Sequence, residues 1–145
     1  MPSSPVLREL ERGDSQWATA LPVLRQLRPH LTDELLDDVL KDGAPQGLRF
    51  TALFEDDRCV AVVGWRVVVN TSAIRKLYID DLATDAAARS RGHGAALLEA
   101  LAARGRELGC RSIELDSGVQ RHDAHRFYLR ERMDITAHHF ARALS

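Results

Sequence analysis

The sequence predicts an α/β fold built on one mixed sheet, and three observations support this. Runs of β-branched and aromatic residues joined by short turns fill the middle of the chain, over 48–84. A leucine- and alanine-rich run with helical spacing follows over 95–108, and a strand-like run comes next over 111–116. Antiparallel strands that continue into strand, helix, strand and helix imply a sheet that is mixed rather than purely parallel.

The N-terminal third is expected to hold a short strand and two helices. Residues 6–10 form the strand, and Asp14 or Ser15 can cap the first helix because their side chains accept hydrogen bonds from its free amides. Pro22 is expected to bend or delimit the first turns. Thr32 caps the second helix, which ends near Gly43. The apolar residues of the first helix recur at helical spacing and are Trp17, Leu21, Leu24, Leu27 and Leu31.

Three strands are expected in the centre of the chain. The runs 48–54 and 59–69 are joined by a four-residue acidic turn and predict a hairpin. A third long strand follows over 74–84. Because neighbouring residues of a strand face opposite ways, Asp80 and Asp81 are expected to lie on opposite faces of the sheet.

The C-terminal part is expected to add a helix, a strand and a closing strand over 134–143. A chain of 145 residues without repeats, linkers or low-complexity tracts predicts a single domain over 1–145. The formal net charge of −1 gives no reason to expect nucleic acid or a membrane surface as a partner. The start lacks the apolar core of a signal peptide, so the cytoplasm is the expected location.

Cysteine and histidine spacing predicts no metal site. Cys59 and Cys110 form no Cys-x-x-Cys pair and are expected to be reduced. No further ligand falls at a zinc spacing from either histidine pair. These pairs are His122 with His125 and His138 with His139.

The segment 80–94 has the layout of a phosphate-binding loop, because an extended stretch leads into two arginines, two glycines and a helix. Gly92 and Gly94 allow the backbone to approach a ligand closely. The first amides of a helix have no partner within it, and the helix dipole favours an anion there. Arg89 and Arg91 can add charge and forked hydrogen bonds.

One interpretation of this loop is a dinucleotide fingerprint, which would make NAD the ligand. That fingerprint requires a tight turn and a third glycine three residues after the second, but Leu97 occupies that place and the loop from Thr84 to Gly92 is too long. Asp116 does imitate the acid that binds the ribose in that fold, so the alternative stays open.

A second interpretation rests on two stretches of sequence. The first reads Leu82-Ala83-Thr84-Asp85 and then Arg89-Ser90-Arg91-Gly92-His93-Gly94, and the second reads Ala124-His125-Arg126-Phe127-Tyr128. They resemble the acetyl-CoA signature and the Ala-x-x-Phe-Tyr motif of the GCN5-related N-acetyltransferase (GNAT) family. The resemblance extends from about residue 48 to the end of the chain.

The resemblance implies a GNAT-type sheet, mixed and mostly antiparallel, flanked by helices and splayed between its fourth and fifth strands. It also implies acetyl-CoA as co-substrate, with its pyrophosphate on the loop amides and its pantetheine arm along the fourth strand. Arg121 stands where the family usually has an asparagine that contacts the pantetheine. The implied cofactor-binding residues are Leu82, Ala83, Thr84, Arg89, Ser90, Arg91, Gly92, His93, Gly94, Ala95 and Arg121.

The resemblance places a general acid at Tyr128, whose phenol stays protonated at neutral pH because its ordinary pKa is about 10. The alternative is a tyrosine that packs beside Phe127. An acidic residue just before the pantetheine segment commonly takes the proton of the amine. Asp81 is slightly favoured over Asp80 for this role, with a solvated or ion-paired carboxylate as the competing interpretation for both. Glu114 and Asp116 are weaker candidates.

The function so implied is direct transfer of an acetyl group from acetyl-CoA to a primary amine in a ternary complex. A small-molecule acceptor is favoured because the chain is short and has no added recognition domain. The alternatives are a protein N-acetyltransferase and a CoA-binding regulatory module without catalysis. A homodimer is compatible with the fold, because strands at the end of such sheets often pair across subunits.

Overall fold

The computed structural model describes residues 4–89 and 91–145 and divides the chain into two compact units, Met1–Glu114 and Leu115–Ser145. Each unit is described by itself. The strands are β1 Val6–Leu10, β2 Arg49–Glu55, β3 Arg58–Val68, β4 Lys76–Thr84 and β5 Ser112–Leu115. The helices are α1 Trp17–Leu27, α2 Asp33–Gly43, α3 His93–Glu107 and α4 His122–Arg130, with short 3₁₀ turns at Ala44–Gln46 and Ala86–Ala88.

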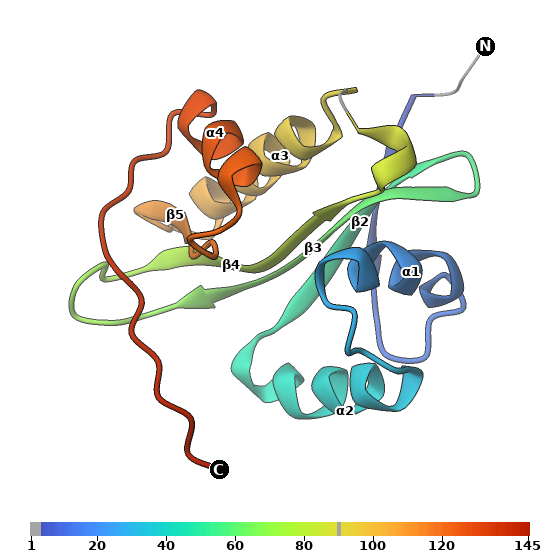
Figure 1. The fold of residues 1–145 in the computed structure, drawn as a ribbon, viewed down its shortest axis with the longest axis horizontal. Helices are drawn as coiled ribbons and strands as arrows, with labels where there is room; N and C mark the ends of the chain where they lie inside the picture. Colours follow the sequence, from blue (N-terminus) through green and yellow to red (C-terminus); the bar gives the residue numbers. More distant parts are fainter. Residues whose placement is uncertain (1–3, 90) are drawn as a thin grey trace. The chain divides into compact units, whose positions relative to one another are not determined.

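The strands form one sheet in the order β1-β2-β3-β4-β5 (Figure 1). Neighbours from β1 to β4 pair antiparallel, and β5 runs parallel to β4 because α3 connects the two strands. The prediction of a mixed, mostly antiparallel sheet flanked by helices is therefore confirmed.

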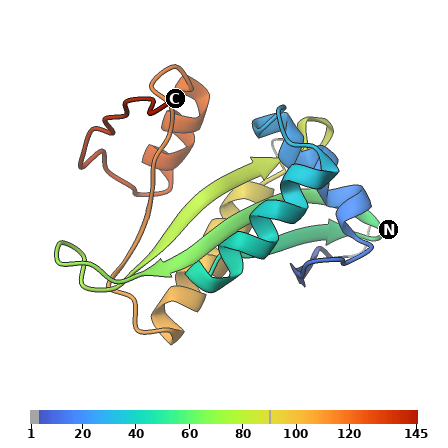
Figure 2. The same ribbon diagram turned by 90° about the horizontal axis from the view of Figure 1, so that it is seen from below.

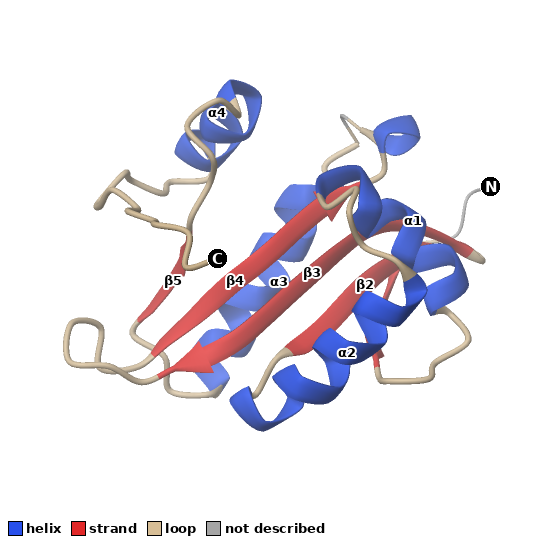
Figure 3. Ribbon diagram, turned by 60° about the horizontal axis from the view of Figure 1, so that its bottom comes forward, coloured by secondary structure: helices blue, strands red, loops and turns tan. Residues whose placement is uncertain are grey.

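Two layers of helix enclose the first four strands. Helices α1 and α2 cover one face of the sheet, and α3 covers the other (Figures 2 and 3). On the α1 side, the core is built around Leu24, Val62 and Phe50, with the Trp17 ring set edge-on to Phe50 at a centroid distance of 5.2 Å. On the α3 side, the fully buried Leu97 belongs to the apolar stripe that the sequence predicts.

The helix starts agree in part with the capping predictions. Thr32 caps α2 as predicted, since its Oγ1 accepts from the Leu35 amide at 3.1 Å. Helix α1 instead begins after Gln16, which makes no side-chain cap. Asp14 accepts from the Gln16 amide at 2.9 Å and so closes the preceding turn rather than capping the helix. Pro22 lies inside α1 without ending it.

The predicted closing strand over 134–143 is wrong. No strand is assigned within residues 134–145, and each of these residues is exposed. Phe140 and Leu144 are 92% and 93% exposed, so these side chains bury too little apolar surface to stabilise a strand. Within the described residues, no helix combines the length and apolar composition that crossing a membrane requires.

Candidate functional site

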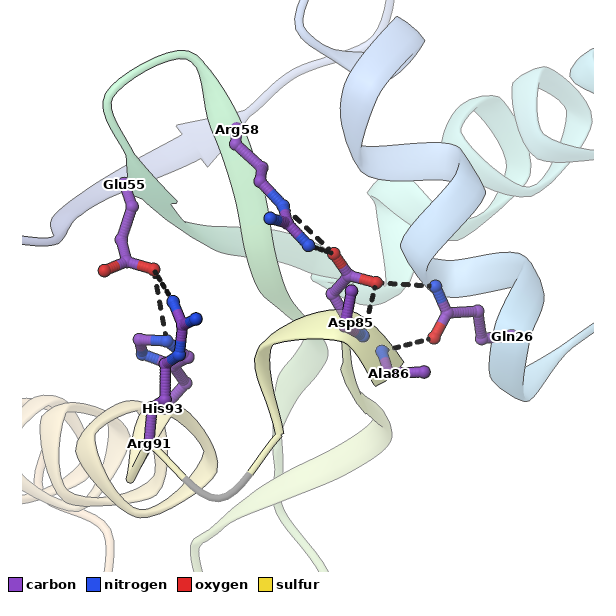
Figure 4. A network of polar contacts seen from close by, with 8 residues as sticks. Gln26, Glu55, Arg58, Asp85, Ala86, Arg91 and His93 are labelled. Atoms are coloured by element: carbon purple, nitrogen blue, oxygen red, sulfur yellow. Dashed lines mark hydrogen bonds and ion pairs between the residues drawn. The ribbon is translucent and has the colours of Figure 1, made fainter.

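The loop between β4 and α3 is fixed by a polar network around Asp85 (Figure 4). Gln26 Nε2 donates to Asp85 Oδ1 at 3.0 Å, and Arg58 Nη2 donates to Oδ2 at 2.6 Å. The Ala86 amide donates to Gln26 Oε1 at 2.8 Å. These hydrogen bonds, that of Gln26 first and that of Arg58 second, lower the pKa of Asp85. The network ties the start of the loop to both α1 and β3.

The loop leads into the start of α3 with a backbone geometry that is typical of anion-binding sites. Gly92 precedes the helix with φ +78°, a left-handed backbone conformation that favours glycine. Lack of space is not the reason for glycine here, because no atom lies within 4 Å of a Cβ built at this position. The Ala96 amide makes the first helical hydrogen bond, to Gly92 O at 2.9 Å. The amides of His93, Gly94 and Ala95 therefore have no acceptor within the helix. The helix begins two residues earlier than predicted, at His93.

Two arginines, one histidine and one glutamate surround the start of α3, and the motif predicts only the arginines and the histidine. Arg89 is exposed, and Arg91 is 58% exposed with its Nη1 at 3.7 Å from Glu55 Oε1. His93 is buried, and its Nε2 lies 3.3 Å from the same oxygen without hydrogen-bond geometry. His93 can thus offer a ligand its backbone amide rather than its ring. Ser90 lies outside the described residues.

Two backbone positions of β4 point away from β3. The Asp85 amide donates to Val60 O at 2.9 Å, which sets the hydrogen-bonded positions of this antiparallel pair. Hydrogen-bonded and non-hydrogen-bonded pairs alternate, so Ala83 bonds to β3. Leu82 and Thr84 direct their N–H and C=O groups to the opposite edge of β4.

Strand β5 runs beside only the first half of β4. The Arg111 amide donates to Arg75 O at 2.8 Å, which sets the start of β5 next to the start of β4. Because β5 has four residues and β4 has nine, the second half of β4 extends beyond it. The edge at Leu82 and Thr84 is therefore the place where an extended ligand could pair with the sheet.

A β-bulge interrupts β4 next to this edge. The register steps from Asp81 opposite Gly64 to Ile79 opposite Trp65, so Asp80 is an extra residue. Asp80 and Asp81 consequently line the same hollow on the face that α2 covers. The prediction that they face opposite ways is wrong, because strict alternation holds only in a strand without a bulge.

Two hollows lie between α2 and the sheet, and we call them together the α2 groove. Their volumes are about 320 and 230 Å³, and they share Val39, Phe50 and Asp81. The first hollow is also lined by Leu24, Arg28, His30, Leu31 and Leu36, and the second by Gln46, Leu48, Arg66 and Asp80. The groove thus combines an apolar wall with a charged strip on β3, β4 and the end of α1.

The charged strip consists of two ion pairs. Arg28 Nε donates to Asp81 Oδ1 at 2.7 Å, and its Nη2 donates to the Asp80 carbonyl at 3.2 Å. Arg66 Nε donates to Asp80 Oδ2 at 3.0 Å. Sequence reasoning missed both arginines. Arg66 could have been noticed as a charged residue within the apolar run of β3. Nothing in the sequence marks Arg28, because its position depends on where α1 ends.

Tyr128 and Arg121 belong to the second unit. Tyr128 lies on α4 with its ring 5.3 Å from that of Phe127, as the packing interpretation expects. Burial raises the pKa of Tyr128, and the charge of Arg121 and its hydrogen bond to the phenol oppose that shift. The phenol is therefore protonated at neutral pH, which a general acid requires.

The weaker base candidates have other partners. Glu114 lies 3.1 Å from Lys76 Nζ, and Asp116 lies 3.2 Å from His139 Nδ1. Among the described residues, no group of three or more His, Cys, Asp or Glu side chains could hold a metal ion.

Comparisons with known proteins bear on the family and the fold of this chain. The sequence profile of the acetyltransferase (GNAT) family matches residues 10–133. An uncharacterized N-acetyltransferase of Bacillus subtilis (strain 168), YhdJ, is 34% identical over 122 residues, which cover 83% of this chain and 85% of YhdJ.

Solved acetyltransferase structures have the same fold. The aminoglycoside N-acetyltransferase AAC(6')-Iy in complex with CoA matches with a TM-score of 0.82 and 17% identity, over 100% of this chain and 98% of that one. Glucosamine-6-phosphate N-acetyltransferase from Arabidopsis thaliana matches with a TM-score of 0.78 and 18% identity, over 99% and 100% of the two chains. The profile match and the relative in Bacillus together place this chain in the acetyltransferase (GNAT) family.

Proposed function

We propose that this acetyltransferase moves an acetyl group from acetyl-CoA directly to a primary amine of a small molecule. One observation carries the proposal: the anion-binding start of α3 follows an open half of β4, and the same half-strand begins with two carboxylates in a groove. A donor and an acceptor could therefore meet at a single strand. The CoA complex of AAC(6')-Iy supports the choice of donor.

The donor is bound mainly by backbone. The amides of residues 93–95 hold the pyrophosphate of CoA, where the helix dipole adds to the attraction. Arg89 and Arg91 supply positive charge, and Arg91 exchanges Glu55 for phosphate. Leu82 and Thr84 pair with the pantetheine arm as a neighbouring strand would. In this proposal Arg121 contacts the same arm.

The transfer needs no covalent acyl-enzyme. The amine lone pair attacks the thioester carbonyl, the N–C bond forms and the C–S bond breaks. The amine proton passes to Asp81, directly or through a water, and Tyr128 protonates the departing thiolate. A backbone amide on the open edge of β4 polarises the carbonyl, a contribution typically worth about 3 kcal/mol. Burial raises the pKa of Cys59 to about 11, so this thiol stays neutral and is a poor nucleophile.

The size of the α2 groove supports a small acceptor. Small-molecule sites have volumes of about 300–1,000 Å³. The larger hollow, at about 320 Å³, lies at the lower end of this range, and the other, at about 230 Å³, lies below it. Two solved structures of the same fold are an aminoglycoside N-acetyltransferase and a glucosamine-6-phosphate N-acetyltransferase, and both names specify a small molecule.

Calorimetric titration with acetyl-CoA, followed by turnover assays on a panel of amines, tests the proposal. Gly92→Glu puts a carboxylate at the phosphate site and should weaken binding at least tenfold. Gly13→Glu is the matched control, because Gly13 has a similar φ of +82°, equally open surroundings and a position outside the site. Equal affinity of both variants, or binding of NAD in place of acetyl-CoA, would refute the donor site. Binding without turnover of any amine would favour a regulatory CoA-binding module.

A further inference from the structure

The α2 groove carries balanced charge rather than the acidic surface that a polyamine requires. Its lining includes two guanidinium groups, from Arg28 and Arg66, and two carboxylates, from Asp80 and Asp81. The charges of these four groups sum to zero. A ligand with several positive charges would meet as much repulsion as attraction here.

The acidic residues of α2 do not change this balance. Helix α2 contributes Leu36 and Val39 to the groove, and its acidic side chains are absent from the lining among the described residues. Asp37, one of them, pairs with Arg12 at 2.8 Å and is half exposed. The apolar stripe of α2 therefore faces the acceptor, and its charged face points elsewhere.

Both arginines keep hydrogen-bonding capacity beyond their aspartate partners. A guanidinium has five N–H donors. The bonds of Arg28 to Asp81 and to the Asp80 carbonyl account for two of them. The side chain of Arg28 is 44% exposed and that of Arg66 is 33% exposed, so neither pair is sealed inside the core. Each guanidinium can therefore donate hydrogen bonds to an oxyanion while it still contacts its carboxylate.

We infer that the acceptor is zwitterionic, with a primary amine at one end and a carboxylate or comparable oxyanion at the other. This inference rests on the proposed function. The ammonium group approaches Asp81, which lines both hollows next to the open edge of β4. The oxyanion binds the guanidinium groups of Arg28 and Arg66, and the apolar wall at Val39 and Phe50 contacts the carbon chain between the two ends.

Three amines with a three-carbon chain distinguish a zwitterion, a neutral-tailed amine and a diamine. They are β-alanine, propylamine and 1,3-diaminopropane. The same comparison with 4-aminobutanoate, butylamine and 1,4-diaminobutane covers a second spacing. The wild-type protein is expected to acetylate a zwitterion with kcat/KM at least tenfold above its neutral and dicationic counterparts. Preference for the neutral amine or the diamine would overturn the inference and leave the proposed function standing. Turnover of no amine would overturn both.

Single variants show whether the arginines bind the acceptor or only hold the aspartates. Arg28→Gln and Arg66→Gln should each lower kcat/KM for the zwitterion at least tenfold, while the diamine gains from the unpaired carboxylate. A uniform loss for all three amines would mean that the arginines only position the aspartates, and the inference would fail. Arg12→Gln removes the arginine of an Arg–Asp pair outside the groove and should leave the preference unchanged.

Discussion

The donor region and the α2 groove use different parts of the polypeptide. The proposed donor region consists of the start of α3 and the open edge of β4, where backbone groups are available to a ligand. The groove uses side chains from α1, α2 and three strands, and its polar groups are two ion pairs. A backbone site depends on local sequence, because glycine and helix position create it. A side-chain site depends on the whole fold, because residues far apart in the sequence form it. Since the two regions share no side chains, substitutions in the groove should change acceptor choice and leave acetyl-CoA affinity unaltered.

The largest effect is expected from Tyr128→Phe, which removes the acid for the thiolate. Turnover should fall about 10²–10⁴-fold, the usual contribution of a general acid, while calorimetry shows unchanged acetyl-CoA affinity. Because burial raises the pKa of Tyr128, the alkaline loss of kcat should lie above the pH at which an ordinary tyrosine titrates. Tyr78→Phe makes the same change in the only other tyrosine and should retain turnover. Full activity of the Tyr128 variant would leave that residue a packing role only.

A smaller effect is expected in the groove. Asp81→Asn removes the charge nearest the donor edge and should lower kcat/KM for the amine about 10–100-fold, with a lesser loss for Asp80→Asn. Steady-state kinetics with saturating acetyl-CoA measures both. Asp37→Asn, in the ion pair outside the groove, is the matched control. A change in acetyl-CoA affinity as large as that in amine kinetics would contradict the separation of the two regions.

Gly64 lies beside Phe50, a residue that lines both hollows of the α2 groove. A Cβ at Gly64 would lie 2.7 Å from the Phe50 ring, so Gly64→Ala should cost about 1–3 kcal/mol by overpacking and should raise KM for the amine. Gly105→Ala is the control with the opposite sign. Gly105 lies inside α3, and a Cβ there would contact Leu77 at an ordinary distance of 3.6 Å. Because alanine has the higher helix propensity, this substitution should add about 1 kcal/mol of stability. Urea unfolding measures both, and equal stabilities would disprove the tight contact.

The smallest effect is expected at the loop anchor. Asp85→Asn should reduce the free energy of unfolding by about 1–2 kcal/mol at pH 7, because it weakens the bonds to Arg58 and Gln26. The folded-state pKa of Asp85 is lowered, so its stabilisation is present above the ordinary value of about 3.9 and is lost as pH falls through the folded pKa. Urea unfolding between pH 7 and pH 3 should show the wild-type and variant curves converging. A constant gap would rule out the ion pair as the cause.

Sequence reasoning could propose the backbone site because its parts are contiguous: the glycine at 92, the arginines beside it and the helix that follows. The structure places Gly92 in the left-handed conformation directly before α3, and the binding of acetyl-CoA by this segment stays a prediction. The order of strands and helices was predictable for the same reason, since periodicity and turns are short-range signals.

The groove could not be predicted in the same way. Arg28 and Asp81 are 53 residues apart, and only the packing of α1 on the sheet brings them together. Strict alternation failed at Asp80 because a bulge depends on how two strands pair and leaves no clear mark in one of them. The closing strand over 134–143 failed because apolar residues such as Phe140 stay exposed there, and an apolar residue stabilises a strand only where it packs against neighbours.

The extra residue at Asp80 divides β4 into two halves whose side-chain phases differ by one position. The bulge places the carboxylates of Asp80 and Asp81 in one hollow, and the backbone groups of Leu82 and Thr84 that point away from β3 follow directly after them. Exchanging the two carboxylates for other side chains would therefore leave the register of β4 with β3 unchanged. In a strand that alternates strictly, one of these two side chains would instead lie on the face that α3 covers.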